Sequence, residues 1–371
     1  MNFDRPGRKA LCLALAVLIL APRPTQAWGE RGHDVVTRVA VRLLAAKIAK
    51  GTPLASQFAR REFMLGHLAN IPDIYWRNQG EAVEKVNAPT HFLDIENVSP
   101  EVTFQTIPRT VAEGLARMKQ LCSTKPAGYV CPAKEGSSPD ESSAGTAPFR
   151  VGQFYRLTVQ NLKAASAGEK IDSAAVDRAF VTAGLMSHFV GDLGNPYHAA
   201  RNYDGWETNQ GGIHGYFESA VVANYRLILD QEVFDAAMRP GAVERVLKNI
   251  PPSERAALSK DPVAVAVALA LDSYSRLETA NAIDRKFGII KASGTGPDGK
   301  RLSAERRDPA ELRLKYHDLH VERLATAAEV LATLWYEAWQ EAGRPDFKGY
   351  QSFAYALTPE FVAPDYLSDS K

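Results

Sequence analysis

The feature that most constrains this chain is a run of two histidines and one aspartate with the spacing H-x3-D-x5-H, at His188, Asp192 and His198. Side chains four residues apart lie on one face of a helix, so His188 and Asp192 are expected to point together. Gly194 and Pro196 are expected to end that helix, and the turn beyond it can return His198 toward the same point. The run therefore predicts a helix end that carries a cluster of potential metal ligands.

A second pair with helical spacing follows at His214 and Glu218. Imidazole and carboxylate are the groups that bind zinc when one position is left open for water. A single histidine on a helix is more often a core residue than a ligand, but two such pairs around a third histidine favour a metal site. His67, His317 and His320 lack partners at this spacing, and they are assigned to packing or to the surface.

Other donors of the same chemistry occur earlier in the chain. Trp28 stands a few residues before His33, Asp73 follows an expected helix end, and His91 precedes Asp94 by three positions. A free amino group at Trp28, together with its own carbonyl, could chelate a metal. Considered alone, Trp28 is better interpreted as an anchored terminus, and Asp73 as a solvated loop acid.

The first residues have the form of a secretory signal peptide. Basic residues precede an apolar run over residues 10–21, and a small-residue cleavage site ends at Ala27. The run is too short to span a bilayer, and no later one approaches that length, so no transmembrane segment is expected. Cleavage after Ala27 predicts a secreted or periplasmic protein that begins at Trp28.

Charge argues against a globally basic protein. Residues 1–27 carry four basic side chains and one acidic one, so their removal lowers the formal net charge from +1 to −2. The overall electrostatic signature of a polyanion binder is therefore missing, although a local patch or metal ions could replace it.

The cysteines are expected to form one disulfide. Cys12 lies in the predicted signal peptide, which leaves Cys122 and Cys131 at the ends of a short loop. In an oxidising compartment this favours a bond between them, with two free buried thiols as the alternative. Their spacing is not that of a zinc-binding cysteine pair.

Helical periodicity dominates, and no run of strand alternation stands out. We therefore predict an all-α fold, with a single helical domain over residues 28–343 that is interrupted by two polar loops, at residues 135–148 and 291–309, and is followed by a tail over residues 344–371. Helices are expected over residues 35–49, 57–70, 107–121, 152–167, 174–190, 213–229, 263–283 and 310–343.

Taken in chain order, these motifs resemble those of the trinuclear-zinc phosphoesterases, which include bacterial zinc-dependent phospholipase C and the fungal and plant single-strand-specific nucleases. The matching elements are a tryptophan exposed by cleavage, a nearby histidine, an aspartate, His-Phe-x-Asp, H-x3-D-x5-H and H-x3-[D/E], over about residues 28–225. The resemblance implies an all-α fold. Residues after about 230 match no motif of the family.

The resemblance also implies three Zn²⁺ ions, and it implies that Asp73 orients the attacking water as well as ligating metal. The implied ligands are Asp73, His91, His188 and Asp192 for the first ion, Trp28, His33 and the shared Asp192 for the second, and His198, His214 and Glu218 for the third.

Such a site suits phosphodiester hydrolysis, because zinc lowers the pKa of bound water toward ~7 and neutralises charge on phosphoryl oxygens. The donors do not fill three coordination shells, which favours catalysis over a closed structural site. A non-catalytic zinc-binding helical protein is the alternative from another class.

The substrate is expected to be either a phospholipid membrane surface or single-stranded nucleic acid, and nothing indicates a protein partner. The last motif has Glu218 and lacks tryptophan, which resembles phospholipase C. The short interval from Trp28 to His33 resembles the nucleases, in which residues matching Phe92 and Asp94 bind a base. Phospholipase C is the preferred interpretation, and a nuclease or nucleotidase is the alternative.

Overall fold

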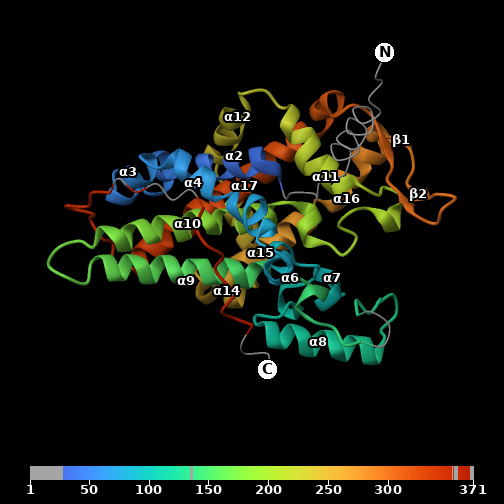
Figure 1. Cartoon of the computed structure of the whole chain (residues 1–371), viewed down its shortest axis with the longest axis horizontal. Coiled ribbons are helices and arrows are strands. Elements are labelled where there is room, and N and C mark those ends of the chain that lie inside the picture. Colours follow the sequence, from blue (N-terminus) through green and yellow to red (C-terminus); the bar gives the residue numbers. More distant parts are fainter. Residues whose placement is uncertain (1–27, 134–136, 353, 355–357, 368–371) are drawn as a thin grey trace, which may run out of the picture.

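The structure is a computed structural model that describes residues 28–133, 137–352, 354 and 358–367 (Figure 1). The signal peptide predicted over residues 1–27 lies outside this part. Helix accounts for 65% of the chain and strand for 3%, so the prediction of a predominantly helical fold is confirmed. Within the described residues, none of the helices combines the length and the apolar character needed to cross a membrane.

The central element is helix α10, Ser173–Gly194. It begins where the carboxylate of Asp172 accepts hydrogen bonds from the backbone N–H groups of Ala174 and Ala175, at 2.9 and 3.2 Å. Its last three turns are buried on all sides, which is the pattern of a helix inside a core. The helix ends at Gly194, as predicted, and Pro196 opens a short 3₁₀ turn.

Helices from both halves of the chain surround α10. The closest neighbour is α9, Ala147–Ala165, which runs beside it in the lower left of Figure 1. The long last helix crosses behind it, and its Trp335 donates from Nε1 to the carbonyl of Ala183 at 3.1 Å. Other helices that contact α10 include α2, Gly29–Leu43, α4, Glu62–Leu68, α15, Pro262–Tyr274, and α17, Pro309–Glu341.

Three predicted helices are interrupted. The segment over residues 57–70 divides into two helices, and so does the segment over residues 263–283. The predicted helix over residues 213–229 is wrong as a single element: it consists of a helical turn, a π-helix and a 3₁₀ turn that ends at Asn224. The remaining helices are α3, Pro53–Ala59, α5, Ile71–Ile74, α6, Glu81–Asn87, α7, Ile95–Val98, α8, Val111–Thr124, α11, Ile213–Gly215, α12, Leu229–Met238, α13, Ala242–Leu247, α14, Pro252–Leu258, and α16, Leu277–Ile283.

The polar loop predicted over residues 291–309 is a β-hairpin, which corrects the expectation of a purely helical chain. Strand β1, Ile289–Lys291, pairs antiparallel with β4, Glu305–Arg306, and β2, Gly294–Thr295, pairs antiparallel with β3, Arg301–Leu302. Both ladders are short and exposed, so no buried face imposes the alternation by which strands are recognised. The hairpin projects at the upper right of Figure 1.

The first predicted polar loop, residues 135–148, is shorter than expected. Residues 134–136 lie outside the described part, a 3₁₀ turn spans Glu141–Ser143, and α9 already begins at Ala147. Gly145 has a positive φ of 78°, and a Cβ at this position would come within 2.1 Å of the carbonyl oxygen of Phe92. Glycine is therefore required where this loop closes onto the segment after His91.

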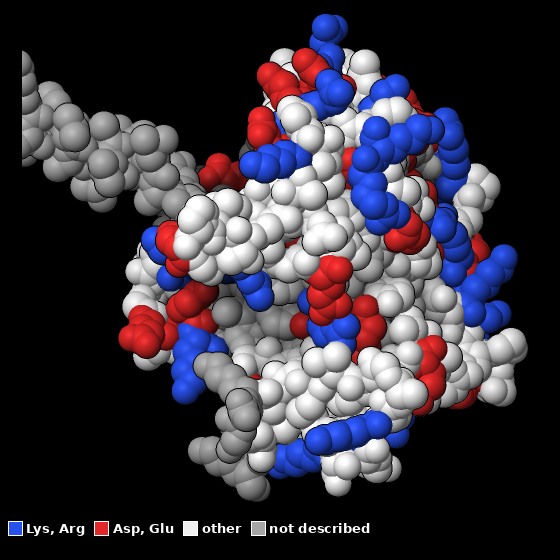
Figure 2. Space-filling view, turned by 90° about the vertical axis from the view of Figure 1, so that its right-hand side faces the viewer, with Lys and Arg blue, Asp and Glu red and all other residues white. Residues whose placement is uncertain are grey.

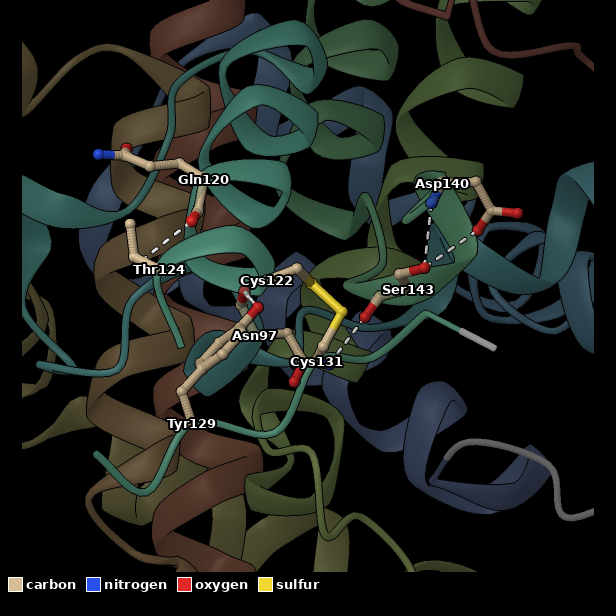
Figure 3. Close-up of a disulfide and its surroundings, with 8 residues drawn as sticks. All are labelled: Asn97, Gln120, Cys122, Thr124, Tyr129, Cys131, Asp140 and Ser143. Carbon is tan, nitrogen blue, oxygen red and sulfur yellow. Dashed lines mark hydrogen bonds between the residues drawn. A yellow bond between two sulfur atoms is a disulfide. The ribbon is translucent and has the colours of Figure 1, made fainter. Parts of the chain in front are cut away.

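The predicted disulfide between Cys122 and Cys131 is confirmed, with the two Cα atoms 5.0 Å apart (Figure 3). The loop that it closes places the Tyr129 hydroxyl within 2.9 Å of the Asn97 carbonyl, to which it donates. Asn97 in turn donates from Nδ2 to the Ser143 carbonyl at 2.7 Å. The disulfide loop therefore supports the segment that follows Asp94.

The segment predicted as a C-terminal tail packs against the helices. Trp76 donates from Nε1 to the Pro359 carbonyl at 2.9 Å, and the rings of Trp76 and Phe361 meet edge to face. Arg150, on α9, donates to the Val362 carbonyl at 2.5 Å. The described residues up to 367 thus cover one side of α9 and the turn that follows α5.

Candidate metal centre

Four side chains from three elements meet at the C-terminal end of α10. Helix α10 supplies His188 and Asp192, helix α5 supplies Asp73, and the 3₁₀ turn Ala88–His91 supplies His91. His91 Nδ1 lies 2.9 Å from His188 Nε2 and 3.1 Å from Asp192 Oδ2. The structure therefore brings together all four residues predicted for the first ion.

The spacing of these donors suits a tetrahedral metal ion. Zinc bonds of ~2.0–2.1 Å place adjacent tetrahedral ligands roughly 3.3 Å apart. His188 Nε2 lies 3.2 Å from Asp192 Oδ2 and 3.8 Å from Asp73 Oδ1, and Asp73 Oδ1 lies 3.6 Å from His91 Nδ1. Together with the two shorter distances above, these values lie on both sides of the expected one.

The histidines are held so that one ring nitrogen faces the cluster. His188 Nδ1 lies 2.7 Å from the Ala69 carbonyl, and His198 Nδ1 lies 2.7 Å from the His91 carbonyl. Because a carbonyl can only accept, each Nδ1 carries a hydrogen, and in the neutral ring each Nε2 offers a lone pair. Metal-ligating histidines are typically oriented by such a bond on the other nitrogen.

A second group of three donors stands beside the first. His198 Nε2 lies 2.9 Å from His214 Nε2 and 3.2 Å from Glu218 Oε2, and His214 Nε2 lies 2.8 Å from the same oxygen. Glu218 lies in a π-helix, Tyr216–Val221, that begins at the end of α11. Single-turn π-helices are frequent at functional sites.

His33 extends the first cluster in another direction. Its Nε2 lies 3.3 Å from Asp192 Oδ1, the carboxylate oxygen that does not face His188. The rings of His33 and His188 stack with their centroids 4.1 Å apart. A Cβ on Gly191 would come within 2.8 Å of His33 Nδ1, so α10 needs glycine there to admit the imidazole. Asp192 is thereby shared between His33 and the first cluster, as predicted for a bridging ligand.

Trp28 is anchored by its indole and presents its backbone to the centre. Nε1 donates to the Gly191 carbonyl at 2.6 Å, and the ring packs against Phe217. The backbone nitrogen lies 3.1 Å from Glu218 Oε2, a donor of the group with His198, and no close contact with His33 is seen among the described atoms. In the full chain this nitrogen belongs to the peptide bond with Ala27, so it donates to Glu218 instead of offering a lone pair.

The charges in the centre stabilise ionised carboxylates. Although burial opposes ionisation, His188 and His198 hold the pKa of Asp192 well below its usual range, and His188 and Arg77 lower that of Asp73. Burial and Arg77 lower the pKa of His91 to about 4, so its ring is neutral near pH 7. Against the effect of burial, Asp192 and Glu218 raise the pKa of His198 to about 9.

Several buried polar atoms of these residues have no hydrogen-bond partner, although such atoms are rarely left unpaired inside a protein. A bound metal would satisfy donors of this kind, and burial without one would be costly for three carboxylates. The residues present therefore fit metal ions. The unpaired atoms are His33 Nε2 and the carboxylate oxygens Asp73 Oδ2, Asp192 Oδ1 and Glu218 Oε1, together with His33 Nδ1, His91 Nε2 and His214 Nδ1, which are the ring nitrogens that do not face the donor groups.

Sequence reasoning missed two residues that contact the centre. Arg77 donates from Nε to Asp73 Oδ1 at 2.8 Å, one helical turn after the aspartate. Asn195 donates from Nδ2 to Glu218 Oε2 at 2.8 Å. Arg77 could have been found from its i, i+4 spacing to Asp73. Asn195 carried no signal beyond its place inside the H-x3-D-x5-H run.

The residues predicted to bind a base lie directly after His91. Phe92 is half-buried, and the Asp94 backbone donates to the Ala144 carbonyl at 2.7 Å. Burial and the nearby Glu96 raise the pKa of Asp94 well above its usual range.

No family model matches this sequence, and no curated protein matches it. The arrangement of the donors is therefore the evidence on which a function is proposed.

Proposed function

We propose that the protein is a zinc-dependent hydrolase of phosphodiesters that holds three ions, and that phospholipid is its substrate. The observation that carries the proposal is the clustering of two abutting donor groups and His33 around Asp192, all buried, at one end of α10. Donor sets that combine imidazole with carboxylate, and that contain no cysteine, are typical of catalytic zinc sites. When bound, zinc would supply an activated water and neutralise charge on the phosphoryl group.

The side chains have separate tasks in this proposal. Arg77 holds Asp73 Oδ1, while Asp73 Oδ2 is buried and has no partner. An ionised carboxylate oxygen in that position can accept a hydrogen bond from a water and orient it toward phosphorus. Asn195 and the fixed His198 ring hold Glu218 in place. The chain therefore orients both the water and the ligand set before substrate arrives.

Asp73→Asn tests the water-orienting role. The amide keeps one oxygen as a possible ligand, but its NH₂ group cannot accept a hydrogen bond from the water. We therefore expect a loss in kcat of about a hundredfold or more with only partial loss of zinc. Zinc content by mass spectrometry and hydrolysis of a chromogenic phosphodiester would be measured on one preparation. Full zinc occupancy together with full activity would remove Asp73 from the mechanism.

A lipid substrate is favoured by the residues that surround the last motif. Phe217 precedes Glu218, and its ring packs inside the core against Trp28 and Tyr316. No tryptophan stands at this point, in keeping with the resemblance to phospholipase C. A nuclease or nucleotidase is the second candidate, because the half-buried Phe92 and the neighbouring Asp94 could bind a base by stacking and hydrogen bonds.

The discriminating experiment uses purified protein that begins at Trp28. Phosphatidylcholine vesicles and single-stranded DNA would be offered separately, each with and without a zinc chelator. We expect chelator-sensitive release of diacylglycerol and intact DNA. Chelator-sensitive DNA cleavage with intact lipid would instead establish the nuclease.

A zinc-sequestering protein without turnover is separated by the chromogenic phosphodiester alone. Such a protein would bind zinc and leave the ester intact at any zinc concentration. Bulk metal analysis cannot make this distinction, because both proteins contain zinc.

A further inference from the structure

One end of the molecule combines exposed aliphatic side chains with cations. It consists of the loop over residues 225–228, the hairpin over residues 289–306 and the first turns of α17, and we call it the hairpin end. We propose that the hairpin end docks on a membrane surface that contains anionic lipid. The claim that this end docks rests on these residues alone. The claim that docking serves catalysis rests on the proposed phospholipase function.

Exposed aliphatic residues concentrate there. Single apolar residues on a surface are ordinary, but a concentration of them marks an interaction site. Of the ten large hydrophobic residues that are exposed among the described residues, half belong to the hairpin end. They are Leu227, Ile228, Ile290, Leu302 and Leu314, with exposed fractions of 89%, 59%, 58%, 51% and 70%.

Direct contacts join the three segments into one surface. The Tyr225 hydroxyl donates to the Arg313 carbonyl at 2.9 Å, which ties the loop to the start of α17. Lys315 Nζ lies 4.9 Å from the centre of the Phe287 ring, just before the hairpin. The backbone of Arg307 donates to the Gly288 carbonyl at 2.9 Å and closes the base of the hairpin.

The charge of the hairpin end is opposite to that of the rest of the chain. Residues 284–315 contain nine basic and five acidic side chains, a net of +4 in a chain whose total is +1. Figure 2 views the face on which the hairpin projects, and Lys and Arg side chains gather in its upper right. Exposed cations of the hairpin end are Arg226, Lys291, Lys300, Arg301 and Lys315, and the exposed Arg285, Lys286 and Arg307 flank it.

Exposed aliphatic side chains among cations favour a lipid surface over a nucleic acid as the partner of the hairpin end. Leucine and isoleucine can enter the boundary between headgroups and acyl chains while lysine and arginine pair with anionic headgroups. Single-stranded nucleic acid is bound instead by aromatic rings on which bases stack. None of the five exposed hydrophobic residues of this end is aromatic.

The hairpin end is physically joined to the metal centre. The backbone of Ala304 donates to the Gly211 carbonyl at 2.9 Å, and Arg306 donates from Nη1 to the same carbonyl at 3.1 Å. Arg306 also forms a buried ion pair with Asp284. Gly211 lies three residues before His214, so the hairpin holds the loop that leads to that histidine and would bring a bound surface beside the centre.

The test measures vesicle binding without turnover. Vesicles of a neutral galactolipid with a minority of an anionic sulfolipid contain no phosphodiester, so the metal centre cannot hydrolyse them. Zinc-loaded full-length mature protein would be sedimented with them at low salt. We expect Leu227→Ser and Leu314→Ser each to weaken binding roughly tenfold, and Arg226→Gln with Lys291→Gln to weaken it about fivefold per cation removed.

Matched controls come from the other end of the chain. Phe63→Ser removes an aromatic residue that is also 70% exposed, and Lys50→Gln with Arg60→Gln removes two exposed cations. These variants should bind vesicles like the wild type, and all variants should hydrolyse a soluble phosphodiester at the wild-type rate. Vesicle affinity that is unchanged in the hairpin variants would overturn the proposal, as would retention by single-stranded DNA in place of vesicles.

The two proposals can fail separately. Vesicle binding that depends on the hairpin end, in a protein that hydrolyses no phosphodiester, would keep the docking surface and reject the hydrolase. Hydrolysis of vesicle phospholipid that is unaffected by the hairpin variants would keep the hydrolase and reject docking.

Discussion

Asp192 joins two parts of the metal centre through its two carboxylate oxygens. Oδ2 faces His91 and His188, whereas Oδ1 faces His33. The side chain is fully buried at the end of α10, and nearby imidazoles keep its pKa low. A substitution at this residue should therefore affect two ions at once.

We expect Asp192→Asn to release two of the three proposed zinc ions. An amide presents one oxygen and no charge, so it cannot bridge, and hydrolysis should fall by more than about a hundredfold. Metal content by mass spectrometry would read about one zinc per chain. His214→Asn is the comparison, because it should remove only the ion of its own group. Equal zinc losses in the two variants would contradict a bridging role.

His320 should make the fold sensitive to acid. It is fully buried, contacts the Tyr225 hydroxyl at 2.8 Å, and burial lowers its pKa to about 3. In the unfolded chain a histidine titrates near about pH 6.5, so between these values protons bind the unfolded chain preferentially. The stability that neutral His320 contributes is complete above about pH 6.5 and is lost as the pH falls toward about 3.

The expected loss is about 2 kcal/mol in the free energy of unfolding between about pH 7.5 and about pH 5. Urea titrations at both pH values would measure it for the wild type and for His320→Gln, which cannot gain a proton in this range. The pH-dependent loss should be smaller in the variant by that amount. The same pH dependence in both proteins would exclude His320 as its source.

Single residues were predictable where spacing imposed a common face. The donors His188, Asp192, His214 and Glu218 recur at helical intervals, and the structure groups each pair. Asn195 is a lone polar residue, and only the fold shows that it contacts a ligand, whereas the i, i+4 spacing of Arg77 to Asp73 was a signal that could have been used. The contact between Trp28 and Glu218 joins residues far apart in the chain, which local patterns cannot reveal.

Among the elements, the long helices were predictable and the irregular segments were not. The periodicity that predicted α10 and α17 extends over many turns, and tertiary contacts only adjusted their ends. The segment over residues 213–229 has the same apolar content, but a π-helix interrupts it to aim Glu218 at the centre. The exposed hairpin lacked a buried face, so its strands carried no alternation signal.

The disulfide should stabilise an element as well as the whole fold. It closes a loop with a sequence separation of nine after α8, and the loop holds Asn97 through Tyr129. By loop-closure entropy, Cys122→Ser with Cys131→Ser should lower the free energy of unfolding by about 2–3 kcal/mol.

Denaturant unfolding and limited proteolysis would be compared for the wild type, the double serine variant and the reduced wild type. Cleavage after α8 should become faster in the last two. If the variant unfolds like the oxidised wild type, the bond contributes nothing to the native state.

On the scale of the whole molecule, the C-terminal segment packs over residues that lie behind the first donor group. Arg150 is buried, its Nη1 donates to Gln153 Oε1 at 2.5 Å, and its guanidinium lies 4.7 Å from the Phe154 ring and 5.7 Å from the Phe361 ring. Burial lowers its pKa to about 10, so it stays charged near neutral pH. Trp76, which follows α5 and its Asp73, is covered by the same segment.

Removal of residues 345–371 should therefore loosen both the fold and the metal centre. It uncovers Trp76 and takes away the carbonyl that Arg150 contacts, so we expect the free energy of unfolding to fall by about 3 kcal/mol or more. Because Trp76 follows Asp73 closely, zinc should also pass to a chelator faster, which a colorimetric chelator would record.

Arg150→Met separates the effect of the buried positive charge from the effect of the C-terminal segment that covers it. In the full-length chain it keeps the apolar contacts and removes the charge, so its cost should be smaller than that of the truncation. In the truncated chain it should recover part of the lost stability, because no cation is left without its acceptor. Additive effects of the two changes would show that Arg150 and the C-terminal segment act independently. Unchanged zinc release after truncation would confine the role of the segment to stability.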